Sequence, residues 1–246
     1  RSPVIGPLNY RSEAYQIVAG GTVEVKDAPL IFCGYGIVAP EYGHNDYEGI
    51  DMTGKIAVVL VNDPGFQTED PASFKGNTMT YYGRWTYKYE EAARQGAAGV
   101  LIIHETGAAG YPWFVVSSSW SGTRLTLDDA SMPKSPLNGW ITLDAAKELF
   151  TASGIRPAEP WFSWPLAEGF KPIPLNMGLT TSINNDLRRD KSYNLVARIE
   201  GLTQADEHVL YMAHWDHIGT GPAVDGDTIY NGALDNASGT AQMMAV

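Results

Sequence analysis

Two continuous apolar runs, separated by one amphipathic segment, constrain the fold of this chain more than any other feature. Residues 55–61 read Lys-Ile-Ala-Val-Val-Leu-Val and residues 98–104 read Ala-Gly-Val-Leu-Ile-Ile-His. Unbroken runs of this kind are typical of strands that are buried on both faces of a sheet. Residues 85–95 have helical spacing, and Gly96 provides a stop signal. The order strand, helix, strand predicts an α/β unit.

Further elements are expected on both sides of this unit. The apolar stretch 30–38 predicts a strand, and residues 64–83, rich in turn formers, predict a long surface loop. A short strand at 140–142 is followed by a predicted helix at 143–150. The Pro- and Trp-rich residues 154–177 predict a connector between domains.

The C-terminal part carries a second set of strand signals. Residues 192–200 and 208–213 are rich in apolar and β-branched side chains, and a polar turn joins them. From about Asn236, Ala, Met and Val predict the first turns of a helix.

Composition excludes some classes of function. The 246 residues are 44% hydrophobic and carry a formal net charge of −11, which indicates a globular acidic protein. Nucleic-acid binding and attachment to an anionic membrane both rest on clustered Lys and Arg, so neither is expected. No apolar run approaches the roughly 18 residues that a membrane span needs. The single cysteine, Cys33, lies in an apolar stretch and is expected to be a buried small hydrophobe, not a catalytic thiol.

The residues best suited to catalysis follow the run 208–213. His214 can bind zinc through one imidazole nitrogen, and its other nitrogen calls for an orienting carboxylate, for which Asp216 is placed two residues later. Asp235 lies among small residues at the start of the last predicted helix, and a carboxylate there could bridge two metal ions. Ordinary roles remain open: Asp235 could be a helix N-cap, and His217 and Asp225 could be plain loop residues. Spacing alone makes a metal site only a suggestion.

A resemblance strengthens the suggestion. The segments Ala213-His214-Trp215-Asp216-His217-Ile218-Gly219, 227–241 and 192–201 look like the M28 family of zinc aminopeptidases. Upstream, the segments 34–37, 46–47, 54–59 and 91–100 are similar to a protease-associated (PA) domain, which some secreted M28 enzymes carry ahead of the metal-binding segment.

The resemblance implies specific roles. His214 would bind one Zn²⁺, Asp235 would bridge two, and Asp216 would orient His214. The reaction would be the removal of N-terminal residues from a peptide substrate. Its mechanism would be hydrolysis by a water that the two zinc ions activate. The family also needs a Glu-Glu pair, an Asp and a His after Asp235, and none follows before Val246. We therefore expect a fragment that is inactive alone. Glu90-Glu91 precedes His214 on a predicted helix and is expected to be structural.

The expected fold class is α/β: a β-rich α/β domain of the PA type, followed by the first strands of an M28 catalytic domain. Residues 1–23 would belong to or lead from the catalytic domain, 24–170 would form the PA domain, and 171–246 would begin the catalytic domain. The resemblance implies a secreted or periplasmic protein, completed by its missing C-terminal part or a neighbouring chain. The alternatives are a non-catalytic PA module for docking and, ranked last, a one-metal relative such as a glutaminyl cyclase.

Overall fold

The computed structural model describes residues 14–18, 21–119, 127, 131–156, 161–167, 169–217 and 219–245. The chain divides into two compact units, Arg1–Arg188 and Arg189–Val246. The residues of the expected N-terminal segment before Ala14, and residues 19–20, lie outside the described part.

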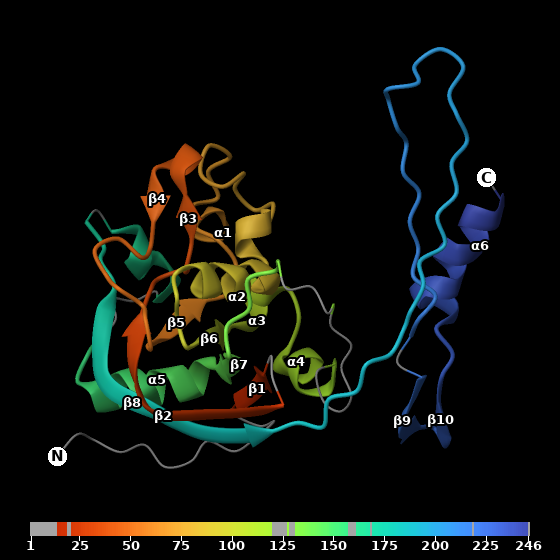
Figure 1. Cartoon of the computed structure of the whole chain (residues 1–246). Coiled ribbons are helices and arrows are strands. Elements are labelled where there is room, and N and C mark those ends of the chain that lie inside the picture. Colours follow the sequence, from red (N-terminus) through yellow and green to blue (C-terminus); the bar gives the residue numbers. More distant parts are fainter. Residues whose placement is uncertain are drawn as a thin grey trace. The chain divides into compact units, whose positions relative to one another are not determined.

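The first unit is built on a six-stranded mixed sheet of order β1-β7-β6-β5-β2-β8 (Figure 1). Its four central strands are parallel, and the two edge strands run antiparallel to their neighbours. The strands are β1 (Ala14–Val18), β2 (Thr22–Phe32), β5 (Ile56–Leu60), β6 (Gly99–His104), β7 (Leu137–Thr142) and β8 (Ile173–Asn184). Every residue of β5 and β6 is buried, so the expectation of strands buried on both faces is confirmed.

Two helices of three turns or so support this sheet. The predicted helix at 85–95 is α2 (Trp85–Arg94), and the predicted helix at 143–150 is α5 (Leu143–Ser153). The hydroxyl of Thr142 caps α5 by accepting from Ala145 N at 3.1 Å, and Gly154 ends it in a left-handed conformation. Shorter helical segments are η1 (Pro40–Tyr42), α1 (Gly65–Thr68), η2 (Tyr81–Gly83), α3 (Thr106–Ala109), α4 (Trp113–Ser119) and η3 (Trp161–Leu166).

The strand expected at 30–38 is placed differently. Strand β2 begins at Thr22 and ends at Phe32, and the backbone then turns at Gly34 and Gly36, whose φ angles are 53° and 64°. Left-handed φ values interrupt a strand and favour glycine. A small hairpin of β3 (Val38–Ala39) and β4 (His44–Asn45) follows the turn.

The interdomain connector expected at 154–177 is wrong in its last five residues, 173–177. Strand β8 starts at Ile173 and pairs antiparallel with β2 over most of its length. The first compact unit therefore continues to Arg188, past the expected boundary at residue 170. The Pro-rich composition of this region favoured a connector over a strand. The alternation of buried and exposed residues that marks β8 begins only after Pro172.

The strands expected at 192–200 and 208–213 are absent: residues 185–217 contain no regular helix or strand (Figure 1). Their apolar side chains are exposed, with Leu195 at 97% and Ile199 at 92% of full exposure. A strand exists only where a neighbour pairs with its backbone. These runs have a high β propensity, but they form no strand in the second unit.

The rest of the second unit is a hairpin followed by a helix. Strands β9 (Gly219–Val224) and β10 (Asp227–Tyr230) pair antiparallel, and a π-helical turn, η4 (Ala233–Ala237), leads into α6 (Ser238–Ala245). The helix expected from about Asn236 is thus confirmed as α6. Across the described residues, no helix combines the length and apolarity that crossing a membrane requires.

Candidate functional site

The structure brings His214, Asp216 and Asp235 together in the second unit. His214 and Asp216 lie in the irregular segment before β9, and Asp235 lies in η4, after β10. His214 Nε2 is 2.8 Å from Asp235 Oδ1. A side chain that follows β10 therefore meets one that precedes β9.

The second ring nitrogen of His214 is held by Asp216, chiefly through the backbone. His214 Nδ1 lies 2.7 Å from the Asp216 carbonyl oxygen and 3.6 Å from its carboxylate. The backbone contact with Asp216, followed by the Asp235 carboxylate, raises the pKa of His214. The raised pKa favours the doubly protonated ring, in which Nδ1 donates to the Asp216 carbonyl and Nε2 donates to the Asp235 carboxylate. A metal ion bound at Nε2 would take the place of that second proton.

The donor types fit zinc, but their number does not complete a site. An imidazole nitrogen and a carboxylate are both zinc ligands, and a catalytic zinc takes about three protein ligands. Among the described residues, no group of three or more His, Cys, Asp or Glu side chains is placed to hold an ion. His217 lies nearby and lines a cavity of about 300 Å³ with Trp215, Thr240 and Met244. Asp225 lies in the turn between β9 and β10.

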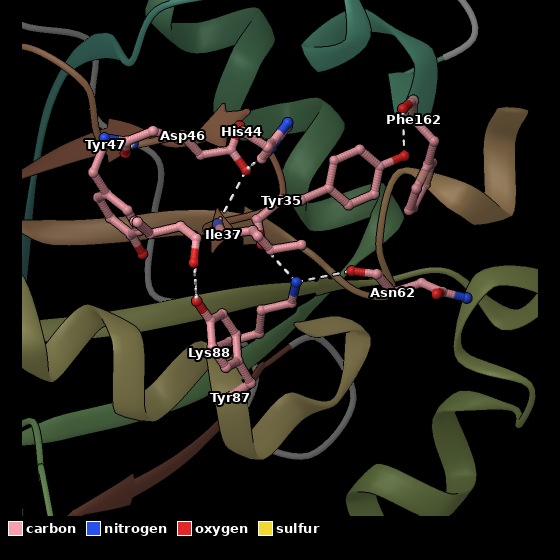
Figure 2. A network of polar contacts seen from close by, with 11 residues as sticks. Tyr35, Ile37, His44, Asp46, Tyr47, Asn62, Tyr87, Lys88 and Phe162 are labelled. Atoms are coloured by element: carbon pink, nitrogen blue, oxygen red, sulfur yellow. Dashed lines mark hydrogen bonds and ion pairs between the residues drawn. The ribbon is translucent and has the colours of Figure 1, made fainter. Parts of the chain in front are cut away.

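The first unit contains a buried polar network that sequence reasoning missed (Figure 2). Its centre is Lys88 of α2, which is fully buried and donates through Nζ to the carbonyl oxygens of Tyr35 at 2.6 Å and Asn62 at 2.8 Å. The two carbonyls belong to the loops that follow β2 and β5. Lys88 therefore joins these two loops to one helix.

Two buried carboxylates complete the network. Asp46 accepts from Ile37 N at 3.0 Å and lies 3.0 Å from His44 Nε2. Asp63 accepts from the backbone and hydroxyl of Thr80 at 2.9 and 2.6 Å. Burial lowers the pKa of Lys88 to about 7, while the charges of Asp46 and Asp63 oppose this shift. No signal in the sequence marks Lys88, since lysine on a helix normally faces solvent.

The pair Glu90-Glu91 has the structural role expected of it. Glu91 is buried and accepts from Arg94 Nε at 2.8 Å, and Glu90 accepts from the Tyr81 hydroxyl at 2.8 Å. Both carboxylates thus brace α2. Cys33 is buried as expected, and burial raises the pKa of its thiol.

The Lys88 pKa predicts a stability profile. Its folded pKa of about 7 lies below the roughly 10.4 of an unfolded lysine, so above pH 7 the unfolded state binds more protons. The free energy of unfolding should therefore rise by about 1–2 kcal/mol between pH 7 and ~8.5, where unfolded Cys33 begins to ionise and opposes the trend. Denaturant titrations across this window measure the rise. A flat profile, or an equal rise in a Lys88→Met variant, would contradict it.

A family model, Peptidase family M28, matches residues 194–246. No curated protein gives a significant match. Among solved structures, the aminopeptidase from Aneurinibacillus sp. strain AM-1 aligns with 70% of this chain at 18% identity and a TM-score of 0.27, and the chain spans only 35% of that protein's length. The segment that carries His214, Asp216 and Asp235 is therefore the segment that matches peptidase family M28.

Proposed function

We propose that this chain carries part of the active site of a zinc aminopeptidase. The observation that carries the proposal is the contact between His214 Nε2 and Asp235 Oδ1, within the segment that matches Peptidase family M28. When bound, zinc would supply Lewis-acid polarisation of a peptide carbonyl and of the attacking water. His214 and Asp235 would hold the ion, and the Asp216 carbonyl would fix the imidazole ring.

We further propose that residues 24–170 act as a PA domain, that the protein is secreted or periplasmic, and that its substrate is a peptide. The parallel central strands of the first unit and its buried core support a separately folded accessory domain, although its sheet also includes β8, beyond residue 170. The competing function is a docking module without catalysis. It is favoured by the shortage of metal donors among the described residues of the second unit.

Zinc titration tests the site. Structural zinc sites bind Zn²⁺ with about 10–16 kcal/mol. The chain alone is expected to bind the ion far more weakly, because the described residues of the site offer two donors instead of three or four. His214→Ala and Asp235→Asn should each remove the residual signal in calorimetry. Asp225→Asn, in the turn between β9 and β10, is the matched control and should leave it unchanged. Tight binding of Zn²⁺ would contradict the proposal that the site is incomplete. Weak binding that is unchanged in both site variants would contradict the assignment of His214 and Asp235 as ligands.

The exposed apolar runs support completion of the second unit by other residues or by a neighbouring chain. Leu195, Val196, Val209 and Leu210 are each at least 77% exposed, which is costly in water. Their backbone can accept pairing strands. We therefore propose that residues 192–213 pair with a further segment of polypeptide.

Sedimentation velocity tests this pairing. The chain is expected to self-associate as its concentration rises, because no other partner is present in the sample. Leu195→Glu and Val209→Glu should shift it toward monomer, whereas Thr203→Glu, in the exposed turn between the runs, should have little effect. A monomer at every concentration would count against the proposal.

A further inference from the structure

A cavity of about 690 Å³ lies at the carboxyl ends of β2 and β5 in the first unit. Its walls come from residues 41–48 after β2, from 64–74 after β5, and from 165–171 before β8. Ligands of open α/β sheets usually bind outside the carboxyl ends of parallel strands, in cavities of roughly 300–1,000 Å³. The volume of this cavity falls within that range, and two of its walls belong to loops that follow parallel strands.

Aromatic rings form one wall of the cavity. Tyr42 and Phe74 stack with centroids 4.2 Å apart, and His44 meets Phe74 edge-on at 5.5 Å. Phe74 is only 3% exposed, and its backbone and that of Lys75 are left-handed, with φ of 48° and 63°. Such conformations cost roughly 1–2 kcal/mol in residues other than glycine, so the fold holds this ring at an energetic cost. Stacked rings offer a surface that attracts a cation.

The charge of the cavity complements such a cation. Four carboxylates line it: Glu41, Asp46, Glu48 and Asp70. Lys171 is the one lysine or arginine among the described residues that line the cavity, and it is paired with Glu48. The remaining carboxylates accept neutral donors: Glu41 from the Tyr82 hydroxyl, Asp70 from Ala72 N and Asp46 from Ile37 N. The lining therefore carries a net negative charge.

Buried hydrogen bonds hold the loops that form these walls in place. Lys88 joins the loops that follow β2 and β5 through its bonds to Tyr35 and Asn62, and Asp63 ties the second loop to Thr80. A cavity with fixed walls loses little entropy when a ligand enters.

We propose that this cavity binds the cationic side chain of a lysine or arginine in a peptide. The ammonium or guanidinium group would lie against the partly exposed ring of Tyr42, which stacks on the buried ring of Phe74, with Glu41 and Asp70 near it. The inference depends on the first unit alone and holds whether or not the second unit forms part of a peptidase site.

Peptide titrations of the whole chain, followed by NMR, test the proposal. The probes are acetylated, amidated Gly-Gly-Lys-Gly-Gly and the same peptide with norleucine in place of lysine, which keeps the stem and removes the charge. The lysine peptide should shift resonances of residues 41–48 and 70–74, more weakly at high salt, and the norleucine peptide should not. Equal shifts from both peptides, or none from either, would overturn the proposal.

Two variants locate the bound cation. Asp70→Asn removes one exposed carboxylate of the cavity, and Tyr42→Leu removes the partly exposed aromatic ring. Each should weaken binding about two- to fivefold, the effect of one exposed cation–π or charge contact. Asp144→Asn, on the exposed face of α5, is the control for loss of a charge and should not change the affinity. If Tyr42→Leu perturbs the fold, Asp70→Asn still decides: an unchanged affinity in that variant would overturn the proposal.

Discussion

Replacing Lys88 with methionine is expected to lower the free energy of unfolding of the first unit by about 2–4 kcal/mol, because two buried carbonyls lose their donor at about 1–3 kcal/mol each. Methionine matches the stem of lysine in length, so little packing is lost. The carbonyls of Tyr35 and Asn62 would lose their donor, and Asp46 and Asp63 would lose the only cation buried near them among the described residues. Urea titration followed by tryptophan fluorescence measures the change.

Lys147→Met is the matched control for this prediction. Lys147 also lies on a helix, but its side chain is half exposed and its contact with Asp144 is a 3.6 Å surface pair. Exposed pairs contribute about 0–1 kcal/mol, so this variant should stay within about 0.5 kcal/mol of the parent chain. If both variants had equal effects, the stability of the first unit would not depend on the buried network.

The network also shows what the sequence could and could not predict in the first unit. Residues 55–61 and 98–104 were predicted as buried strands because a continuous apolar run has few other places to go. The residues around Lys88 in its helix include Tyr, Glu and Arg. This sequence context is typical of a helix face that is exposed to solvent. Its burial depends on two carbonyls that lie 53 and 26 residues away in the chain. Contacts of that range leave no local pattern.

The second unit shows the opposite case. The motif around His214 and Asp235 predicted that two side chains 21 positions apart act together, and the structure places them in direct contact. The runs at 192–200 and 208–213 have strong β propensity, yet they form no strand. Propensity describes how a side chain fits a paired and half-buried surface, and the pairing itself is a tertiary event. The contact is therefore present where the two expected strands are not, and the roles of His214 and Asp235 stay predictions.

Replacing Gly36 with alanine is expected to destabilise the first unit by about 3 kcal/mol. Two costs combine at this position. The φ of 64° costs an alanine roughly 1–2 kcal/mol, and a Cβ there would lie 2.6 Å from Val59 Cγ1, in the fully buried strand β5. Overpacking of a filled core adds about 1–3 kcal/mol. Chemical denaturation monitored by fluorescence measures the total.

Gly43→Ala separates the two costs because Gly43 has the same φ as Gly36 but open space around it. Gly43 has the same φ of 64°, and a Cβ there would meet nothing within 4 Å. This variant should lose only the backbone contribution, about 1–2 kcal/mol. The difference between the two variants then reports the packing of the β2–β3 turn against β5. If Gly36→Ala cost no more than Gly43→Ala, the turn could shift away from Val59. The loop that follows β2 would then be less rigid than its buried contacts imply.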